Sequence, residues 1–233
     1  MRISWRHAVT AMLLAAVATA ASAQMGHFSA PHINGFWNPV VGEGAEYSMQ
    51  TAKGDKTDMQ ITVVGKESVG GKDAYWYETS FNRGSGQMVI KQLKVLNGAD
   101  TQTSRTIMQM LGRPPMEMPA QMTHQDSSPQ TADVRTGGED LGSETITVPA
   151  GTFTCQHYRS KTGGEVWISQ KISPYGLVKF KSNDTSMELT KVITGAKDQI
   201  TGTPQPFNPQ MMMPVSYTHL YLGPQAANPQ HSK

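Results

Sequence analysis

The residues of this chain that are best suited to chemistry are a cysteine and a histidine two positions apart. Cys155 is the only cysteine among 233 residues, and His157 follows it within the segment Thr-Phe-Thr-Cys-Gln-His-Tyr. In a strand both side chains would share one face, where an imidazole could take the proton from a thiol. A buried cysteine acting as a small apolar side chain is the more frequent arrangement. A thiol enzyme using Cys155 and His157 is therefore the third of three hypotheses for function.

Methionine and histidine form a second constellation, which is suited to a metal. Met116, Met118 and Met122 precede His124 in a proline-rich segment. Thioether sulfur suits Cu(I), and imidazole suits copper generally. Methionine also fills irregular apolar gaps without any metal, so this spacing is not selective for copper. A copper-binding protein is the second hypothesis, whereas the leading hypothesis includes no metal and no cofactor.

Large apolar side chains form a third set, which could line a ligand groove on a sheet. Side chains alternate between the two faces of a strand, so each ring or thioether belongs to one face. A single aromatic ring is more often part of a core than of a binding site. The residues expected to contact an apolar or amphipathic ligand are Trp76, Met108, Met110, Trp167, Val178 and Phe180.

The motifs of common enzyme classes are absent from the sequence. It contains no Gly-x-Ser-x-Gly elbow, no His-Glu-x-x-His pair and no glycine-rich loop that feeds a helix. Glu139 and Asp140 are adjacent carboxylates, but they follow a Gly-Gly pair in an expected loop that does not fix their geometry. The sequence therefore favours a binding protein over an enzyme and assigns no catalytic residue.

The amino terminus has the three parts of a cleavable secretory signal. Arg2 and Arg6 precede an apolar run, and Ala21-Ser22-Ala23 is a small-x-small cleavage site. The apolar run is shorter than the roughly 20 residues that a membrane-spanning helix needs. We therefore expect cleavage between Ala23 and Gln24 and a periplasmic or secreted protein that does not span the membrane.

The charge of the expected mature chain excludes a general affinity for nucleic acid. The whole chain has 20 basic and 18 acidic residues. Removing the signal removes Arg2 and Arg6 and no acid, which leaves 18 of each sign. A chain of zero formal charge without a run of Lys or Arg lacks the electrostatic basis of phosphate binding. Its single cysteine cannot form an intramolecular disulfide, so a hydrophobic core must stabilise it.

Short alternating segments separated by Gly, Asn and Asp predict a mainly β protein. The breaks contain residues that tolerate positive φ or hydrogen-bond to their own backbone. Strands repeating every 10 to 15 residues or so indicate antiparallel pairing without crossover helices. The expected strands are 45–51, 58–65, 73–82, 88–95, 103–111, 143–148, 152–160, 164–170, 176–182 and 185–194.

The chain divides into four expected parts. Residues 1–23 are the signal, and residues 24–43 are an irregular lead-in without periodicity. One antiparallel β domain spans 44–198, interrupted at 112–140 by a proline-rich loop that could act as a lid, with a short helix near 117–124. The remainder, 199–233, is rich in Pro, Gln, Asn and Met and is expected to be a disordered or loosely docked tail.

The second group of strands resembles a known family of exported bacterial proteins. The resemblance lies in Val148-Pro149-Ala150-Gly151-Thr152-Phe153, Tyr158-Arg159, Glu165-Val166-Trp167-Ile168-Ser169 and Ser173-Pro174-Tyr175-Gly176-Leu177-Val178-Lys179. It looks like exported β-rich proteins of unknown function whose sheet is similar to that of the LolA/LolB lipoprotein carriers. The general pattern of strands and turns is similar over residues 44–195, and the matching motifs lie within residues 145–195.

This resemblance implies a strongly curved antiparallel sheet, a half-barrel or incomplete barrel, whose concave apolar face holds acyl chains in the carriers. It transfers no catalytic residue. We expect few helices and irregular ends in this chain. The leading hypothesis is therefore a periplasmic binding or carrier protein for an apolar or amphipathic, lipid-like ligand.

Overall fold

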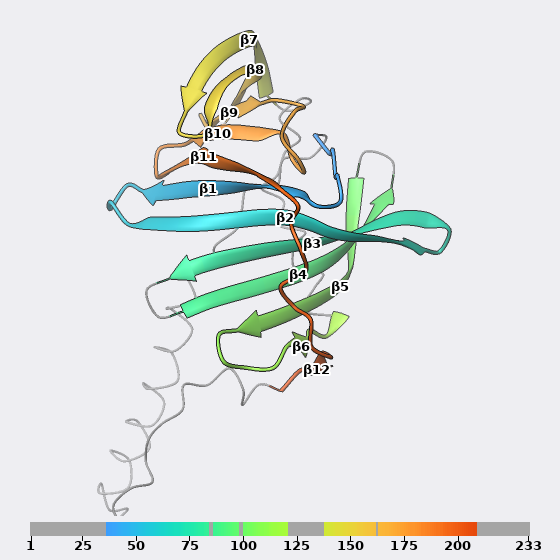
Figure 1. The fold of residues 1–233 in the computed structure, drawn as a ribbon. Coiled ribbons are helices and arrows are strands. Elements are labelled where there is room, and N and C mark those ends of the chain that lie inside the picture. Colours follow the sequence, from blue (N-terminus) through green and yellow to red (C-terminus); the bar gives the residue numbers. More distant parts are fainter. Residues whose placement is uncertain (1–35, 84–85, 98–99, 121–137, 162, 209–233) are drawn as a thin grey trace, which may run out of the picture.

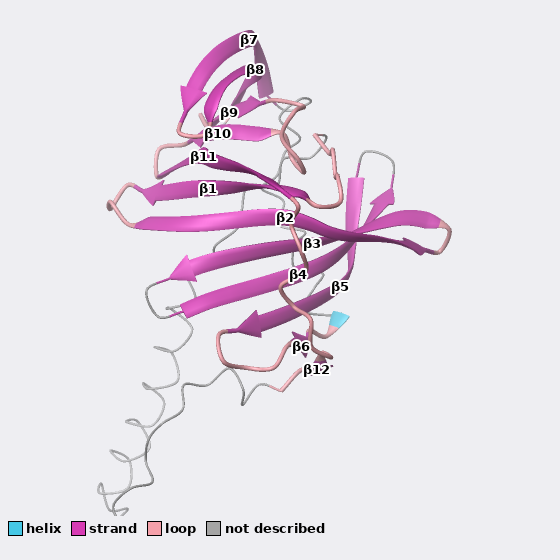
Figure 2. Cartoon of the chain, in the orientation of Figure 1, coloured by secondary structure: helices cyan, strands magenta, loops and turns pink. Residues whose placement is uncertain are grey.

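A computed structural model describes residues 36–83, 86–97, 100–120, 138–161 and 163–208 of the chain. Strands account for most of these residues (Figure 2). They are β1 (Glu43–Thr51), β2 (Lys56–Val69), β3 (Lys72–Arg83), β4 (Gly86–Asn97), β5 (Asp100–Met110), β6 (Met116–Glu117), β7 (Gly138–Val148), β8 (Gly151–Ser160), β9 (Glu165–Ile168), β10 (Leu177–Lys181), β11 (Thr185–Thr194) and β12 (Gln205–Pro206).

The twelve strands form one large sheet that is strongly curved and does not close. Their order is β12-β6-β5-β4-β3-β2-β1-β11-β10-β9-β8-β7. Every neighbouring pair is antiparallel except β12 and β6, which run parallel. At one end of the sheet, β7 and β8 curl over (Figure 1), and the amide of Ala150 in their turn donates to Leu189 O of β11 at 3.2 Å. The predicted mainly antiparallel, incompletely closed fold is confirmed.

Each of the ten predicted segments overlaps one strand, because alternation and turn residues mark strands locally. The turn between β2 and β3 shows the mechanism. Gly70 and Gly71 form a two-residue hairpin loop between the paired residues Val69 and Lys72, with φ of 58° and 78°. Two consecutive positive φ values suit a type I′ turn, which matches the twist of the flanking strands and favours glycine.

Cross-strand registers assign the side chains to two faces of the sheet. One face, here called the core face, includes Tyr47, Met59 and Phe81, which are directly opposite one another on β1, β2 and β3. These residues belong to the main hydrophobic core. The opposite face, here called the strap face, includes Thr62, Glu78 and Lys91 on β2, β3 and β4.

The described part of the irregular lead-in, residues 36–42, packs against the rest of the protein and contains no strand. Trp37 lies 4.7 Å from Tyr77 and 5.1 Å from Tyr175, measured between ring centroids. The Asn38 amide donates to Pro174 O at 2.9 Å. The lead-in therefore connects β3 with the loop that follows β9.

Residues 199–208 are the described part of the segment expected to be a disordered or loosely docked tail, and they lie against the sheet. Residues 195–206, here called the strap, leave β11 and cross β2, β3, β4 and β5 before ending in β12 (Figure 1). Ile200 of the strap is only 4% exposed. One buried isoleucine and its hydrogen-bond partners anchor this segment, although it lacks any periodic pattern.

The proline-rich loop also differs from the prediction in its described part. Met116 and Glu117 form β6, and β7 begins at Gly138 within the predicted 112–140 loop. Of the short helix expected near 117–124, Glu117 lies in β6 instead, Ala120 is helical, and residues beyond 120 lie outside the described ranges. Among the residues placed by the structure, no helix is long and apolar enough to cross a membrane.

Candidate functional site

Six apolar side chains gather on the core face near the β6 edge of the sheet. In one cross-strand row, Phe81 of β3 lies opposite Met88 of β4, which lies opposite Met110 of β5. In the next row, Ile90 lies opposite Met108, which lies opposite Met116 of β6. We call this group the methionine surface: Phe81, Met88, Ile90, Met108, Met110 and Met116.

The methionine surface continues the hydrophobic core, and its side chains range from fully buried to half-buried. Met116 is 1% exposed, and Phe81 and Met108 are each 9% exposed. Met88, Ile90 and Met110 are half-buried, and Met88 and Ile90 pack against the main core cluster. Leu111, the next residue after Met110, is 70% exposed. Apolar area therefore extends from the interior to the surface at this end of β4 and β5.

Of the six residues predicted to contact a ligand, two lie on the methionine surface, Met108 and Met110. Phe180 is opposite Met187 of β11 on the core face but lies on the far side of β1 from them. Val178 is completely buried. The two tryptophans lie elsewhere: Trp76 packs beneath the strap, and Trp167 stacks on His157.

Sequence reasoning missed Met88, Ile90 and Phe81 as partners of the predicted methionines. They could have been identified by assuming that β3–β4 and β4–β5 are consecutive hairpins, because each hairpin sets which residues lie opposite one another. A β4–β5 hairpin with the observed register puts Met88 opposite Met110. Register depends on bulges such as the one between Leu93 and Lys94, and a bulge is not visible in residue alternation.

His157 lies in a cluster of charged and aromatic side chains on β7, β8 and β9. Its ring stacks on Trp167 with centroids 4.2 Å apart and 18° between the ring planes. Glu144 accepts from the Trp167 indole at 2.7 Å and lies 3.1 Å from His157 Nδ1. Glu165 Oε2 is 3.9 Å from His157 Nε2. These contacts orient the imidazole toward carboxylates rather than toward a thiol.

Cys155 does not have the environment of a nucleophile. Its side chain is 1% exposed, and Glu144 lies opposite it in the β7–β8 register. Burial, and secondarily the negative charge of Glu144, raises the pKa of the Cys155 thiol to about 11. A thiol with that pKa is protonated at neutral pH, whereas the thiolate is the reactive form. The geometry therefore does not support the thiol hypothesis.

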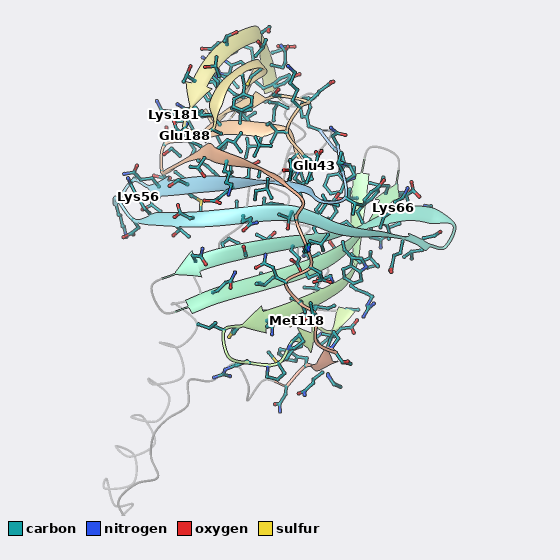
Figure 3. The ribbon with its side chains drawn as sticks, in the orientation of Figure 1. Glu43, Lys56, Lys66, Met118, Lys181 and Glu188 are labelled. Carbon is teal, nitrogen blue, oxygen red and sulfur yellow. The ribbon has the colours of Figure 1, made fainter. Side chains whose placement is uncertain are left out.

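Two of the four predicted copper ligands are described, Met116 and Met118. Met116 pairs with Met108, and the Met118 amide donates to Thr106 O at 2.8 Å, which continues the β5–β6 pairing. Figure 3 labels Met118 beside β5 and β6 at this edge of the sheet. Met122 and His124 lie outside the described residues, so the copper site stays a prediction. Within the described ranges, no group of three His, Cys, Asp or Glu residues could hold a metal ion.

The strap covers an acidic cluster on the strap face. Glu78 is completely buried on β3, and its carboxyl group accepts from the backbone amides of Gln199 and Ile200. Asp198 of the strap forms an ion pair with Lys91 of β4. Sequence reasoning missed Glu78, because a charged residue on a strand normally predicts the solvent-facing side.

Comparisons with known proteins found limited similarity. No family model and no curated protein matches the chain. One similar solved structure is a "putative lipoprotein" from Parabacteroides distasonis, with 13% identity, a TM-score of 0.34, and coverage of 69% of this chain and 99% of the other. Another is a "putative exported protein with YmcC-like fold" from Bacteroides fragilis, with 15% identity, a TM-score of 0.34, and coverage of 68% and 99%. Likeness at this level assigns neither a family nor a function, and the resemblance to the LolA/LolB carriers stays a prediction.

Proposed function

We propose that this chain is an exported binding or carrier protein for an apolar or amphipathic, lipid-like ligand, which it holds on the methionine surface. The observation that carries the proposal is the register of β3 to β6. It brings four methionines, one phenylalanine and one isoleucine together in two adjacent rows. The proposed export rests on the secretory signal at residues 1–23.

Methionine is a suitable residue for such a site. Its unbranched side chain has three rotatable bonds and a polarisable sulfur, so it adapts to ligands of different shape. Half-buried Met88, Ile90 and Met110 have apolar area left to bury. Each square ångström of apolar area removed from water contributes about 25 cal/mol. An acyl chain could therefore bind here without a charged anchor.

A displacement assay tests the proposal. The mature protein is titrated with a hydrophobic fluorescent dye, and the bound dye is then displaced with a fatty acid or with phospholipid. Replacing Met88→Gln or Met110→Gln is expected to weaken binding about tenfold each, because about 1.4 kcal/mol of apolar contact is lost. Both residues are half-buried, so the fold should tolerate the substitutions.

Val192→Gln is the matched control. Val192 is an apolar residue on β11 with 41% of its surface exposed, and β1, β2 and β3 separate its strand from β4. This substitution should leave dye and fatty-acid binding unchanged. Equal weakening by Val192→Gln, or no dye binding by the wild-type protein, would contradict binding at the methionine surface. The second result is expected if another part of this chain covers the surface.

A further inference from the structure

The strap follows a single cross-strand row on the strap face. Its amide of Ala196 donates to Gly42 O at 2.8 Å, and its amide of Gln205 donates to Pro115 O at 2.8 Å. Between these two anchors the strap runs along the row, across the strands (Figure 1). From β1 to β6 the row consists of Gly44, Thr62, Glu78, Lys91, Ile107 and Glu117.

Glu78 is the central attachment point of the strap. Its Oε1 and Oε2 lie 3.1 and 3.0 Å from the Gln199 amide nitrogen, and Oε1 lies 3.3 Å from the Ile200 amide nitrogen. The Ile200 amide also donates to Asp198 Oδ1 at 2.9 Å. Because Glu78 is 0% exposed, water cannot replace these contacts while the strap is closed.

Two carboxyl groups share one cation beneath the strap. Glu78 and Asp198 both accept from the Ile200 amide, so their carboxyl groups lie side by side, and Asp198 pairs with Lys91, whose ammonium lies 5.0 Å from the centroid of the Trp76 ring. With Glu78 protonated, the charges of Asp198 and Lys91 balance. With Glu78 ionised, its buried carboxylate has only the two strap amides as partners and no cation of its own, and such a charge is costly away from water.

The other groups around Glu78 do not supply a second balancing charge. On β2, its neighbour Thr62 is uncharged, and the hydroxyl has no hydrogen-bond partner among the described residues. On β5, Arg105 also lies over the Trp76 ring, but it is bound to Glu117 of β6 at 2.8 Å. Lys197 of the strap is exposed.

We propose that the strap is a proton-controlled latch, closed when Glu78 is protonated and donates to Asp198, and loosened as Glu78 ionises. Loosening would uncover a second apolar cluster, in which Ile200 covers Val89, Ile107 and part of Trp76. An exported protein meets the pH of its surroundings directly, so this latch would couple external acidity to exposure of the strap face. The latch does not depend on ligand binding at the methionine surface.

The latch requires the pKa of Glu78 to be higher when the strap is closed than when it is open. Burial, followed by the hydrogen bond to Asp198, raises the pKa of Glu78 from 4.5 to about 7, and these effects outweigh the hydrogen bonds from the Gln199 and Ile200 amides, which lower it. Burial alone would raise the pKa of Asp198, but hydrogen bonds from Glu78 and Lys91 lower it. The closed strap therefore holds one proton that an open, hydrated strap releases. Its added stability is complete below pH 4.5 and is lost as the pH rises through about 7.

Hydrogen exchange of the full mature chain tests the latch. After correction for intrinsic exchange rates, protection of the Gln199 and Ile200 amides should fall about tenfold per pH unit between roughly pH 5 and 7, and then level off. The amide of Tyr47, in the centre of the sheet, is the internal reference and should not follow this profile. If Tyr47 follows it, the opening is global unfolding and the latch is wrong.

Glu78→Gln is the decisive variant. The neutral amide can still donate to Asp198 and accept from the strap amides, so protection should stay high and independent of pH. Glu188→Gln removes a carboxylate from an ion pair with Lys179 on the β10–β11 ladder and should keep the wild-type profile. A pH-dependent strap in Glu78→Gln would overturn the proposal.

A titration of the wild-type protein keeps the proposal testable if Glu78→Gln does not fold. The carboxyl carbon of Glu78, followed by NMR, should titrate near pH 7, together with the amide signals of Gln199 and Ile200. Titration of Glu78 near 4.5, or strap amides that do not share its midpoint, would overturn the latch.

Discussion

At the residue scale, burial raises the pKa of two ionisable groups, with different consequences at neutral pH. Glu78 is buried beside Asp198, which can accept a hydrogen bond from its protonated form, and the pKa of Glu78 rises to about 7. Cys155 is buried next to Glu144 without a cation, and its thiol stays protonated. Desolvation disfavours the charged form in both cases. Of these two groups, Glu78 alone titrates near neutral pH and can respond to ordinary changes in acidity.

Cys155 should be inert in the folded protein. Its 1% exposure and raised thiol pKa predict almost no alkylation by iodoacetamide at about pH 7.5, and rapid alkylation only after unfolding in denaturant. Cys155→Ala should lower the free energy of unfolding by about 1 kcal/mol through the lost sulfur contacts. Mass spectrometry and urea denaturation measure these two effects. Fast labelling of the native protein would restore the thiol hypothesis.

At the element scale, the approach of β1 to β2 depends on a residue without a side chain. A Cβ atom at Gly44 would lie 2.3 Å from Ile61 O and 2.6 Å from Thr62 Cγ2. The first of these atoms belongs to the backbone of the neighbouring strand, so it cannot move without disturbing the ladder. Gly44 also begins the row that the strap follows, which links strand packing to the position of the latch.

Gly44→Ala should therefore lower the free energy of unfolding by about 2–3 kcal/mol, the usual cost of overpacking a tight site. Gly65→Ala on β2 is the matched control, because the nearest atom to its added Cβ is Trp76 Cδ1 at 3.4 Å. That change should cost less than about 1 kcal/mol. Urea denaturation of both variants makes the comparison. Equal losses would show that the close contact at Gly44 is relieved by strand movement.

At the scale of the whole molecule, one continuous sheet supplies two apolar clusters on opposite faces. The core face holds the main core and the methionine surface, and the strap face holds the small cluster of Val89, Ile107 and Ile200. The lead-in packs against Tyr77 and Tyr175, and the strap packs against Glu78. The segments before β1 and after β11 thus complete the packing of a sheet that does not close on itself.

The proposed function as an exported binding or carrier protein also requires that the chain is exported. The exported protein should begin at Gln24 or at its cyclised form, because Ala21-Ser22-Ala23 matches the small-x-small pattern of a signal-peptidase site. Intact mass measurement of protein from the periplasm or the medium checks this expectation. Recovery of a chain that retains Met1 from either compartment would contradict cleavage.

The sequence by itself determined the class of the fold and most of its strands. Alternation is a local property, so the strand predicted at 185–194 has the same bounds as β11. The pair Gly70-Gly71 likewise indicates a break between two strands from its residue types alone. The sequence also placed Met108 and Met110 on one face, because they are two residues apart on one strand.

The tertiary structure alone decided which distant residues meet. Phe81 and Met88 join Met110 only through the registers of β3, β4 and β5, and Trp76 lies on the opposite face beneath the strap. Ile200 and Glu78 are 122 residues apart, and neither residue's neighbourhood in the sequence predicts their contact. Local periodicity shows which side chains of one strand lie on each of its two faces. Which other segments cover each face depends on packing between residues far apart in the chain. A short segment of sequence carries no information about those contacts.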